Sequence, residues 1–450
     1  MSKGFSAHPI AAAFGLLAIC LICYAVGLMY ITPPDTLKGG IRELQFFSGA
    51  TTWVMFSVLV ITAARPKGLE RWFVLDKYYL FHKFVAFMCV LLAFLHYHAK
   101  QVGRAILPDL FTFASAPAKA AATAAGATPA SGASSFSWRL LAEESGLVLT
   151  YTALALVILT VLFFIPYKHW QKTHRLFPLL YLLMIFHAVY LTENYQYTSP
   201  LFILVVLTTI IAIPCALMSL CGRAGSAKRF PATLVSSETG ERYLRLKFQT
   251  DKAVPAGSFV LLKLKGSNPH PYTVALADDT SLTLFIRKTS RFAHTLQQLA
   301  VNTEVTLEGP YGEAAFNLPE GGRTLFVFQG AGMAQLPAVL QTLQDSKQAP
   351  QAHILILARN AQDELYAQCQ QQLAELQTQG LELELHFSEK AGHFADANCK
   401  ELFRAKYNRV YFCGGQEVKA MLYKAYQHGG GHKRNFVCEY TAWRSFAACN

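Results

Sequence analysis

The chain has 450 residues, of which 53% are hydrophobic and only 15% are charged. Because soluble domains contain about 25% charged residues, part of this chain is expected to lie in lipid. The 13% aromatic content and the ten scattered cysteines exclude disordered, collagen-like and disulfide-scaffold proteins. A net charge of +12 is also found in nucleic-acid-binding proteins, but in a membrane protein it commonly reflects basic cytoplasmic loops. We therefore expect membrane lipid, and no nucleic acid, as a partner.

Apolar runs dominate the first half of the chain. A helix that crosses about 30 Å of hydrocarbon needs about 20 residues. Six runs approach or exceed that length, at 8–31, 41–64, 73–98, 146–166, 174–192 and 199–221. The first run has no small-residue cleavage pattern, so it is expected to remain as a helix. The sequence therefore predicts a six-helix transmembrane bundle within residues 1–223.

Basic residues concentrate in three of the short connectors, at 65–71, 168–175 and 223–229. Connectors rich in Lys and Arg face the cytoplasm. With six spans, this arrangement places both termini in the cytoplasm and residues 33–42, 100–145 and 192–199 on the opposite side. The compact loops favour a bacterial inner membrane, and a eukaryotic membrane stays open.

Four histidines within two predicted spans carry the first chemical signal, because ionisable or metal-binding side chains inside a membrane are usually functional. His82 and His96 lie 14 residues apart on the third span, and His174 and His187 lie 13 apart on the fifth. Each pair is separated by about 20 Å along its helix. Since the two spans are antiparallel, the histidines form two layers, each with one imidazole from each helix.

Two opposed imidazoles in each layer are the ligand set for haem iron, so the pattern predicts two b-type haems. On an ideal helix, the 14-residue pair differs in direction by about 40° but the 13-residue pair by about 140°. Pro178, four residues after His174, is expected to kink the helix and correct this difference. His98 is the alternative to His96, but its direction differs from that of His82 by about 160°.

The second half changes to alternating strands after Arg229. Strands are expected at 242–250, 258–266, 270–276, 281–288 and 304–309, with a helix at 294–300. They predict an antiparallel β-barrel domain covering 228–318. From residue 322 to 450, strands at 324–329, 353–358, 383–387 and 410–414 alternate with helices, which predicts a doubly wound α/β nucleotide-binding domain.

The segment HPYTVA in the barrel suggests a flavin site. Tyr272 is placed to contact an isoalloxazine ring and Thr273 to contact the flavin nitrogens, next to His270 and Pro271. Arg287 on the next strand and the start of a helix at Thr295 suit the flavin phosphates. Ordinary strand packing explains HPYTVA equally well when the segment is taken alone.

The segment QGAGMAQLP follows a strand and opens a helix. Gly330, Ala331 and Gly332 would let a pyrophosphate approach backbone N–H groups. A tight strand-to-helix turn without a ligand also fits this segment. Arg359, after the second strand of this domain, could hold the 2′-phosphate of NADP, so NADPH is preferred over NADH as the expected donor.

Several motifs in this order resemble the NADPH oxidase and ferric reductase superfamily along nearly the whole chain. They are the four histidines, HPYTVA, EGPYG at 308–312, QGAGMAQLP, YFCGG at 411–415 and the terminal VCEYTAWR. The resemblance implies electron transfer from NAD(P)H to FAD and then through two haems to an acceptor outside the membrane. It further implies an inner haem on His82 and His174, an outer haem on His96 and His187, FAD at 270–273, and nicotinamide dinucleotide at 330–332 and at Cys413 and Gly414.

The chain departs from the family pattern at a few positions. Ala334 and Leu336 replace a Gly and a Thr, and Gly415 replaces a Pro. Thr441 falls where the family places a Phe beside the flavin, so Trp443 or Tyr440 is expected to cover the ring instead.

The terminal acceptor is left open by the sequence. A ferric chelate and O₂, which would yield superoxide, are two candidates. The alternative is an electron-donor module that reduces a partner protein or quinone, and an accessory subunit is compatible with each. The segment predicted outside the cytoplasm contains no His/Cys/Asp cluster that would bind iron. A haem-binding sensor would leave the flavin and dinucleotide half unexplained.

Overall fold

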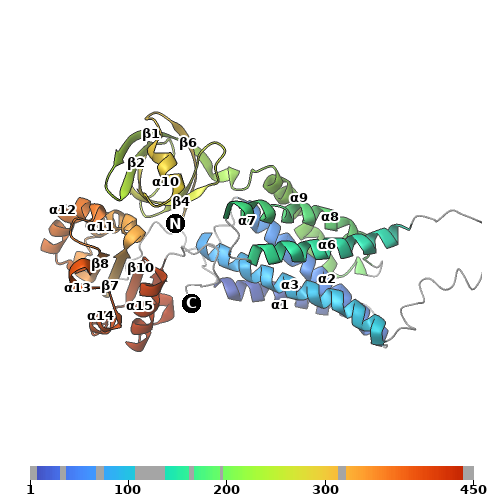
Figure 1. The fold of residues 1–450 in the computed structure, drawn as a ribbon. Helices are drawn as coiled ribbons and strands as arrows, with labels where there is room; N and C mark the ends of the chain where they lie inside the picture. The colour runs from blue at the N-terminus through green and yellow to red at the C-terminus, as the bar shows by residue number, and fades with distance from the viewer. Residues whose placement is uncertain are drawn as a thin grey trace, which may run out of the picture. The chain divides into compact units, whose positions relative to one another are not determined.

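The computed structural model describes residues 8–30, 37–66, 75–106, 137–161, 167–192, 196–312 and 321–438. The chain divides into two compact units. One unit comprises Met1–Phe73 with Lys77–Gly225, and the other comprises Val74–Asp76 with Ser226–Asn450. The first unit is helical, and the second contains two sheets (Figure 1).

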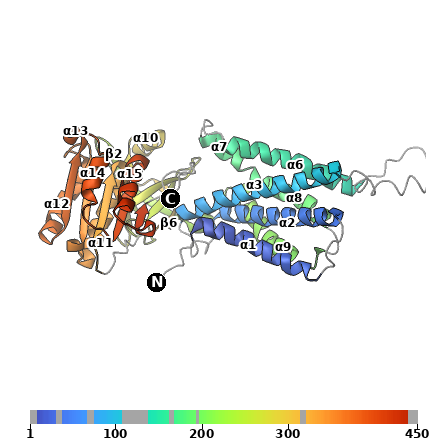
Figure 2. The ribbon, with the colours of Figure 1, turned by 90° about the horizontal axis from the view of Figure 1, so that it is seen from below.

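Helices of the first unit run roughly alongside one another, as both ribbon views show (Figures 1 and 2). Within the described residues, five helices are long and apolar enough to cross a membrane. Their outer faces expose many Leu, Ile and Phe side chains, as lipid contact requires. The helices are α1 (Pro9–Leu28), α2 (Leu37–Ala64), α3 (Leu75–Ile106), α6 (Trp138–Val161), α7 (Tyr167–His174), α8 (Phe177–Tyr190) and α9 (Pro200–Leu220).

The expected span at 174–192 differs from the prediction. Only His174 of this range belongs to α7, and the rest of the range begins a separate helix, α8. Helix α8 has 14 residues, which is about 21 Å of helix and too short to cross the membrane alone. The chain leaves helical hydrogen bonding at Arg175 and Leu176, and Pro178 lies in the first turn of α8. A proline is tolerated there because that N–H would have no helical partner. Pro178 therefore begins a new helix rather than bending a continuous one.

The connector expected at 100–145 is shorter than predicted. Helix α3 continues to Ile106, and α6 already begins at Trp138. An ion pair between Arg139 and Glu143, 3.5 Å apart and one turn away from each other, supports the added first turns of α6. The charged residues in the first turns of α6 lower the hydropathy there, so the prediction began this helix too late.

Polar contacts join α2, α8 and α9 inside the first unit. The Trp53 indole on α2 stacks on Tyr181 of α8 at 4.7 Å and donates a 2.7 Å hydrogen bond to Thr209 of α9. The hydroxyls of Tyr181 and Ser57 are 2.9 Å apart. Because hydrocarbon offers no hydrogen-bond partner, these contacts satisfy the polar groups within the protein.

A closed antiparallel barrel begins the second unit, with strand order β1-β2-β5-β4-β3-β6. This confirms the predicted barrel, whose helix α10 (Arg291–Gln297) begins three residues earlier than expected. The strand 229–239 was not among the predicted strands. The strands are β1 (Arg229–Thr239), β2 (Tyr243–Gln249), β3 (Phe259–Lys263), β4 (His270–Ala277), β5 (Ser281–Arg287) and β6 (Glu304–Tyr311).

Residues 321–438 form a five-stranded parallel sheet of order β11-β10-β7-β8-β9 with helices around it. This confirms the doubly wound fold; the three-residue β11 was not predicted. Its strands are β7 (Thr324–Gln329), β8 (Ala352–Ala358), β9 (Glu382–Phe387), β10 (Arg409–Cys413) and β11 (Phe436–Cys438). Its helices are η5 (Gly330–Gln335), α11 (Leu336–Ser346), α12 (Glu364–Thr378), α13 (Ser388–Ala391), α14 (Asp396–Leu402) and α15 (Gln416–His428).

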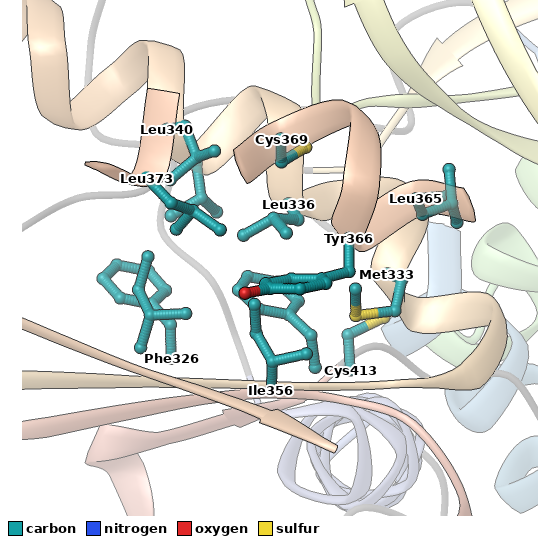
Figure 3. Packing of buried hydrophobic residues seen from close by; sticks show 14 of the residues in the cluster. Phe326, Met333, Leu336, Leu340, Ile356, Leu365, Tyr366, Cys369, Leu373 and Cys413 are labelled. Atoms are coloured by element: carbon teal, nitrogen blue, oxygen red, sulfur yellow. The ribbon is translucent and has the colours of Figure 1, made fainter. Parts of the chain in front are cut away.

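One hydrophobic cluster spans the barrel and the parallel sheet. Tyr243, Ala275 and Phe285 of the barrel pack with residues of β7, β8, η5, α11 and α12. Figure 3 shows the sheet side of this cluster, with Met333, Tyr366 and Cys413 in one group. The shared cluster holds strand β4 of the barrel against η5 and α11.

Candidate functional site

The four membrane histidines come from three helices. His82 and His96 lie on α3, His174 ends α7, and His187 lies in the last turn of α8. The ring centroids of His82 and His174 are 6.3 Å apart, and the two rings are tilted by 60° to each other. The structure thus brings together the pair predicted for the inner layer.

The two histidines of the outer layer have matching partners. Nδ1 of His96 lies 2.9 Å from the carbonyl oxygen of Gln45 on α2, and Nδ1 of His187 lies 2.9 Å from that of Ala142 on α6. A carbonyl oxygen can only accept, so Nδ1 must carry the proton in both rings. The lone pair of each imidazole therefore resides on Nε2.

The inner pair reaches the same protonation state through threonine hydroxyls. Thr62 Oγ1 donates to the Leu59 carbonyl at 2.9 Å and lies 2.9 Å from His82 Nδ1. Thr160 Oγ1 donates to the Leu156 carbonyl at 2.7 Å and lies 3.5 Å from His174 Nδ1. With each hydroxyl hydrogen on its helix carbonyl, each oxygen can accept from Nδ1–H, and the inner pair then has the same tautomer as the outer pair.

All four rings therefore suit metal ligation through Nε2. Ligating histidines almost always donate their other ring nitrogen to an acceptor, which fixes the ring and its tautomer. Metal–imidazole bonds are about 2.0–2.1 Å long, so two rings that share one ion have nitrogens about 4 Å apart and centroids somewhat farther apart. The 6.3 Å between His82 and His174 fits this arrangement.

His98, the alternative to His96, is held within its own helix. Its Nδ1 bonds the Phe94 carbonyl at 3.0 Å, and its ring stacks on that of Phe94 at 3.8 Å between centroids. The contact with Gln45 is made by His96. These contacts favour His96 as the member of the outer layer.

The residues predicted to bind flavin lie along β4. Tyr272 and Thr273 are half-buried and pair with Val260 and Phe259 of β3. Burial raises the pKa of Tyr272 to about 12, so its hydroxyl stays protonated and neutral at physiological pH. His270 stacks on Phe292 at 3.9 Å, and burial lowers its pKa. Pro271, between His270 and Tyr272, is exposed.

Tyr243 connects the barrel to the dinucleotide turn, and sequence reasoning missed it. It pairs with Arg287 across β2 and β5, and its hydroxyl donates to the Gly330 carbonyl at 3.2 Å. Burial raises the pKa of Tyr243 to about 12, so the hydroxyl remains a neutral donor. Arg287 is exposed at the end of β5. It lies beside Tyr243, which contacts the turn at Gly330 after β7.

Thr295 does not begin a helix, which corrects the prediction for this residue. Helix α10 begins at Arg291, and the Ser290 hydroxyl caps it by accepting from the Ala293 N–H at 3.0 Å. Thr295 lies one turn further on, where its hydroxyl donates to the Arg291 carbonyl at 3.3 Å. The start of this helix, which the sequence placed at Thr295, therefore lies at Arg291.

The dinucleotide motifs meet where the strand order reverses, between β7 and β10. Ligands of doubly wound sheets bind at this point, beyond the carboxyl ends of the strands. Gly330, with a φ of +54°, leaves β7 there and begins the short helix η5, which also contains Ala331. A Cβ on Gly332 would collide with the backbone carbonyl of Cys413, so glycine permits the close approach of η5 to the end of β10.

Gln329 is a second residue that sequence reasoning missed. It ends β7, and its side-chain Oε1 accepts from the Gly415 N–H at 3.0 Å. A Cβ on Gly414 would lie 2.8 Å from the Gln329 Cβ, so this turn also depends on glycine. The available signal was the polar Gln329 directly after the apolar run LFVF of this strand.

The remaining predicted residues lie elsewhere. Arg359 is exposed just after β8, at the same edge of the sheet, and its carbonyl accepts from the Glu389 N–H at 3.0 Å. Trp443 lies outside the described residues, as do Tyr440 and Thr441.

Glu364, at the start of α12, links the sheet domain to the barrel. Its carboxylate accepts from the backbone N–H groups of Arg242 at 2.7 Å and Tyr243 at 3.1 Å. It also lies against Gly240, where any Cβ would collide with it. The contact fixes the turn between β1 and β2 against the dinucleotide domain.

Replacing Glu364 with alanine should loosen this link. Hydrogen bonds to charged groups contribute about 1.5–3 kcal/mol each, so we expect a clearly lower thermal midpoint of FAD release from the full-length protein. Glu364→Gln keeps one oxygen acceptor, so its midpoint should lie between those of the unmodified protein and the alanine variant. Glu375→Ala, on the same helix, is the matched control, because its contact is with Gln371 of that helix. Equal midpoints for the Glu364 and Glu375 variants would contradict the link.

Comparisons with known proteins give one match to a family. Residues 48–185 match the sequence model of the ferric reductase like transmembrane component. This segment contains His82, His96 and His174 and ends two residues before His187. No curated protein matches the chain.

Several solved structures are similar to the chain. A flavohemoglobin from Malassezia yamatoensis with bound FAD and heme is 15% identical, with a TM-score of 0.42, over 68% of this chain and 88% of that one. A cytochrome P450 reductase from Amycolatopsis is 21% identical, with a TM-score of 0.40, over 47% and 69%. A ferredoxin NADP+ reductase from Neisseria gonorrhoeae with bound FAD and NADP is 14% identical, with a TM-score of 0.40, over 47% and 98%.

The family match covers the helices that carry the histidine layers, and the barrel and parallel sheet follow it in the chain. The match to the ferric reductase like transmembrane component agrees with the membrane part expected from the resemblance to the NADPH oxidase and ferric reductase superfamily.

Proposed function

We propose that the protein passes electrons from cytoplasmic NAD(P)H, through FAD and two b-type haems, to an acceptor on the opposite side of the membrane. The observation that carries this proposal is the set of four histidines whose Nδ1 atoms all bond to acceptors from α2 or α6. A complete dinucleotide fold alone would support only a soluble reductase. Two layers of imidazoles within apolar helices add a path across the bilayer.

The histidine pairs would each hold one haem iron through Nε2. When bound, FAD accepts a hydride as two electrons and releases them singly, and each haem carries one electron. Thr62 and Thr160 would keep the protons of the inner pair on Nδ1, and the carbonyls of Gln45 and Ala142 would do so for the outer pair. The surrounding apolar helices would exclude water from the path.

The reductase unit provides the binding surfaces. Tyr272 and Thr273 on β4 would contact the flavin ring, and Arg287 would contact its phosphates. The turn from Gly330 to Gly332 and the end of β10 at Cys413 and Gly414 would receive the nicotinamide dinucleotide. Support comes from the packing of β4 against η5, since hydride transfer requires the two ligands to lie side by side.

Arg359 is the residue expected to select NADPH. Replacing it with alanine should raise the KM for NADPH about 10–100-fold, because a charge-assisted hydrogen bond contributes about 1.5–3 kcal/mol, and should leave the KM for NADH unchanged. Lys390→Ala, a nearby exposed cation, is the control. Steady-state rates with each nucleotide measure the effect. A parallel rise in both KM values would show that Arg359 does not recognise the 2′-phosphate.

The acceptor we propose is a ferric chelate or O₂, and an anaerobic experiment tests the whole proposal. The purified full-length protein with FAD receives NADPH or NADH without oxygen, and we expect the spectrum of a six-coordinate b-type haem to become reduced. Absence of a reducible haem would overturn the proposal.

Reoxidation then identifies the acceptor. Rapid reoxidation by air that releases superoxide, detected as a signal that superoxide dismutase abolishes, would indicate an oxidase. Slow reoxidation by air with rapid reoxidation by a ferric chelate would indicate a metalloreductase. Haem that stays reduced with both would overturn the small-molecule acceptor in favour of a partner protein or quinone.

A further inference from the structure

Helices α2 and α6 carry the same set of groups at nearly the same spacing. On α2 the order is the Gln45 carbonyl, Gly49 and Thr62, and on α6 it is the Ala142 carbonyl, Gly146 and Thr160. In both helices the glycine follows the carbonyl residue by four positions, and the threonine follows the glycine by 13 or 14. Each group lies against one of the four histidines.

On each helix, the spacing between the glycine and the threonine is close to the spacing between the two histidines that they contact. His96 and His82 are 14 apart and contact groups on α2, where glycine and threonine are 13 apart. His187 and His174 are 13 apart and contact groups on α6, where the spacing is 14. The first unit therefore contains two related arrangements, α2 with α3 and α6 with α7 and α8, each built around one histidine per layer.

The two glycines are required by the position of the outer imidazoles. A Cβ on Gly49 would lie 2.8 Å from Nδ1 and Cε1 of His96, and a Cβ on Gly146 would collide with the same atoms of His187. Gly49 is one turn above the carbonyl of Gln45, and Gly146 is one turn above that of Ala142. Each outer ring thus rests on a glycine while its Nδ1–H donates to the carbonyl of the turn below.

The two layers differ in the group that accepts from Nδ1–H. Outer histidines donate to backbone carbonyls, which no side-chain substitution removes. Inner histidines donate to threonine hydroxyls, and valine has nearly the shape of threonine without an acceptor. Substitutions of the glycines therefore test the outer layer, and substitutions of the threonines test the inner layer.

From this repeated arrangement we infer that Gly49, Thr62, Gly146 and Thr160 are positioning residues for the haem ligands. The inference rests on the proposed function, and it adds that α2 and α6, which supply no ligand, fix the orientation and tautomer of all four imidazoles. An acceptor on Nδ1–H makes the ligating nitrogen more basic, which favours ferric iron. Loss of that acceptor should therefore raise the midpoint potential of the haem concerned.

The test for the outer layer compares glycine variants of the full-length protein. Gly49→Ala and Gly146→Ala should each weaken the binding of one haem about 10–100-fold, so that the haem-to-FAD ratio falls towards half of that in the unmodified protein. Gly40→Ala is the matched control on α2, because a Cβ there meets no atom within 4 Å. Glycine variants that keep both haems, with spectra equal to those of the control, would overturn the inference.

The test for the inner layer uses Thr62→Val and Thr160→Val, with Thr52→Val and Thr152→Val as controls. The control hydroxyls make the same bond to the carbonyl four residues earlier that Thr160 makes. In an anaerobic redox titration, one haem component should move to higher potential while the other stays unchanged. The shift should be larger for Thr62, at 2.9 Å, than for Thr160, at 3.5 Å.

Unchanged potentials in both threonine variants would overturn the role of the hydroxyls even if the glycine variants failed to fold. Failure of the proposed function gives a different result, because the unmodified protein would then contain no reducible haem. An unmodified protein with two haems and unaffected variants would contradict only the positioning role.

Discussion

Replacing His96 with leucine should remove one of two haems and stop electron transfer to the far side of the membrane. The leucine is apolar and similar in size, so the bundle should still form, while one axial ligand of the outer layer is lost. FAD binding and the reduction of a soluble acceptor by NADPH should persist, because they depend on the second unit. Haem per FAD, together with the rate of reduction of each acceptor, measures the effect.

His98→Leu is the matched control, two residues further along α3. His98 bonds to its own helix through the Phe94 carbonyl, so its variant should keep both haems and full activity. If His98→Leu lost a haem and His96→Leu did not, the assignment of the outer layer would be wrong. If both variants kept both haems, neither His96 nor His98 on α3 would be a ligand of the outer haem.

Replacing Gly332 with alanine should have the largest effect in the reductase unit. The added methyl group would collide with the backbone carbonyl of Cys413, and a backbone atom cannot move aside as a flexible side chain can. Overpacking typically costs about 1–3 kcal/mol. We expect η5 to move away from β10 and the KM for NADPH to rise about 10-fold, the equivalent of about 1.4 kcal/mol.

Gly429→Ala provides the control for Gly332→Ala. It lies in the same domain, has a φ of −78°, and a Cβ there has no contact shorter than 3.5 Å. Its KM should stay near that of the unmodified protein. A Gly332→Ala variant with the same KM as this control would show that the contact between η5 and β10 does not shape the nucleotide site.

The features that the sequence predicted correctly follow from local periodicity. The run HILILA is buried on both faces of β8, as expected of a central parallel strand. Strand β1 was missed because Pro231 lies within it and a bulge between Leu234 and Ser236 interrupts its alternation. The start of α10 was misplaced although Ser290 is a typical N-cap residue.

The sequence predicted the contact between His82 and His174, but other contacts between distant residues were beyond sequence reasoning. The partners Gln45 and His96 are 51 positions apart, and Ala142 and His187 are 45 apart. Every residue has a backbone carbonyl, so the residue types at 45 and 142 do not indicate these bonds. The Glu364 link spans more than 120 positions and likewise depends on how the barrel and sheet pack.

Electron transfer across a sealed membrane tests the central claim most directly. The protein is reconstituted into vesicles that contain trapped ferricyanide, an impermeant one-electron acceptor, and NADPH is added outside. We predict that each NADPH oxidised reduces two trapped ferricyanide ions, and that His96→Leu abolishes this reaction while His98→Leu preserves it. NADPH oxidation that reduces ferricyanide only when it is added outside the vesicles would contradict a path through the membrane.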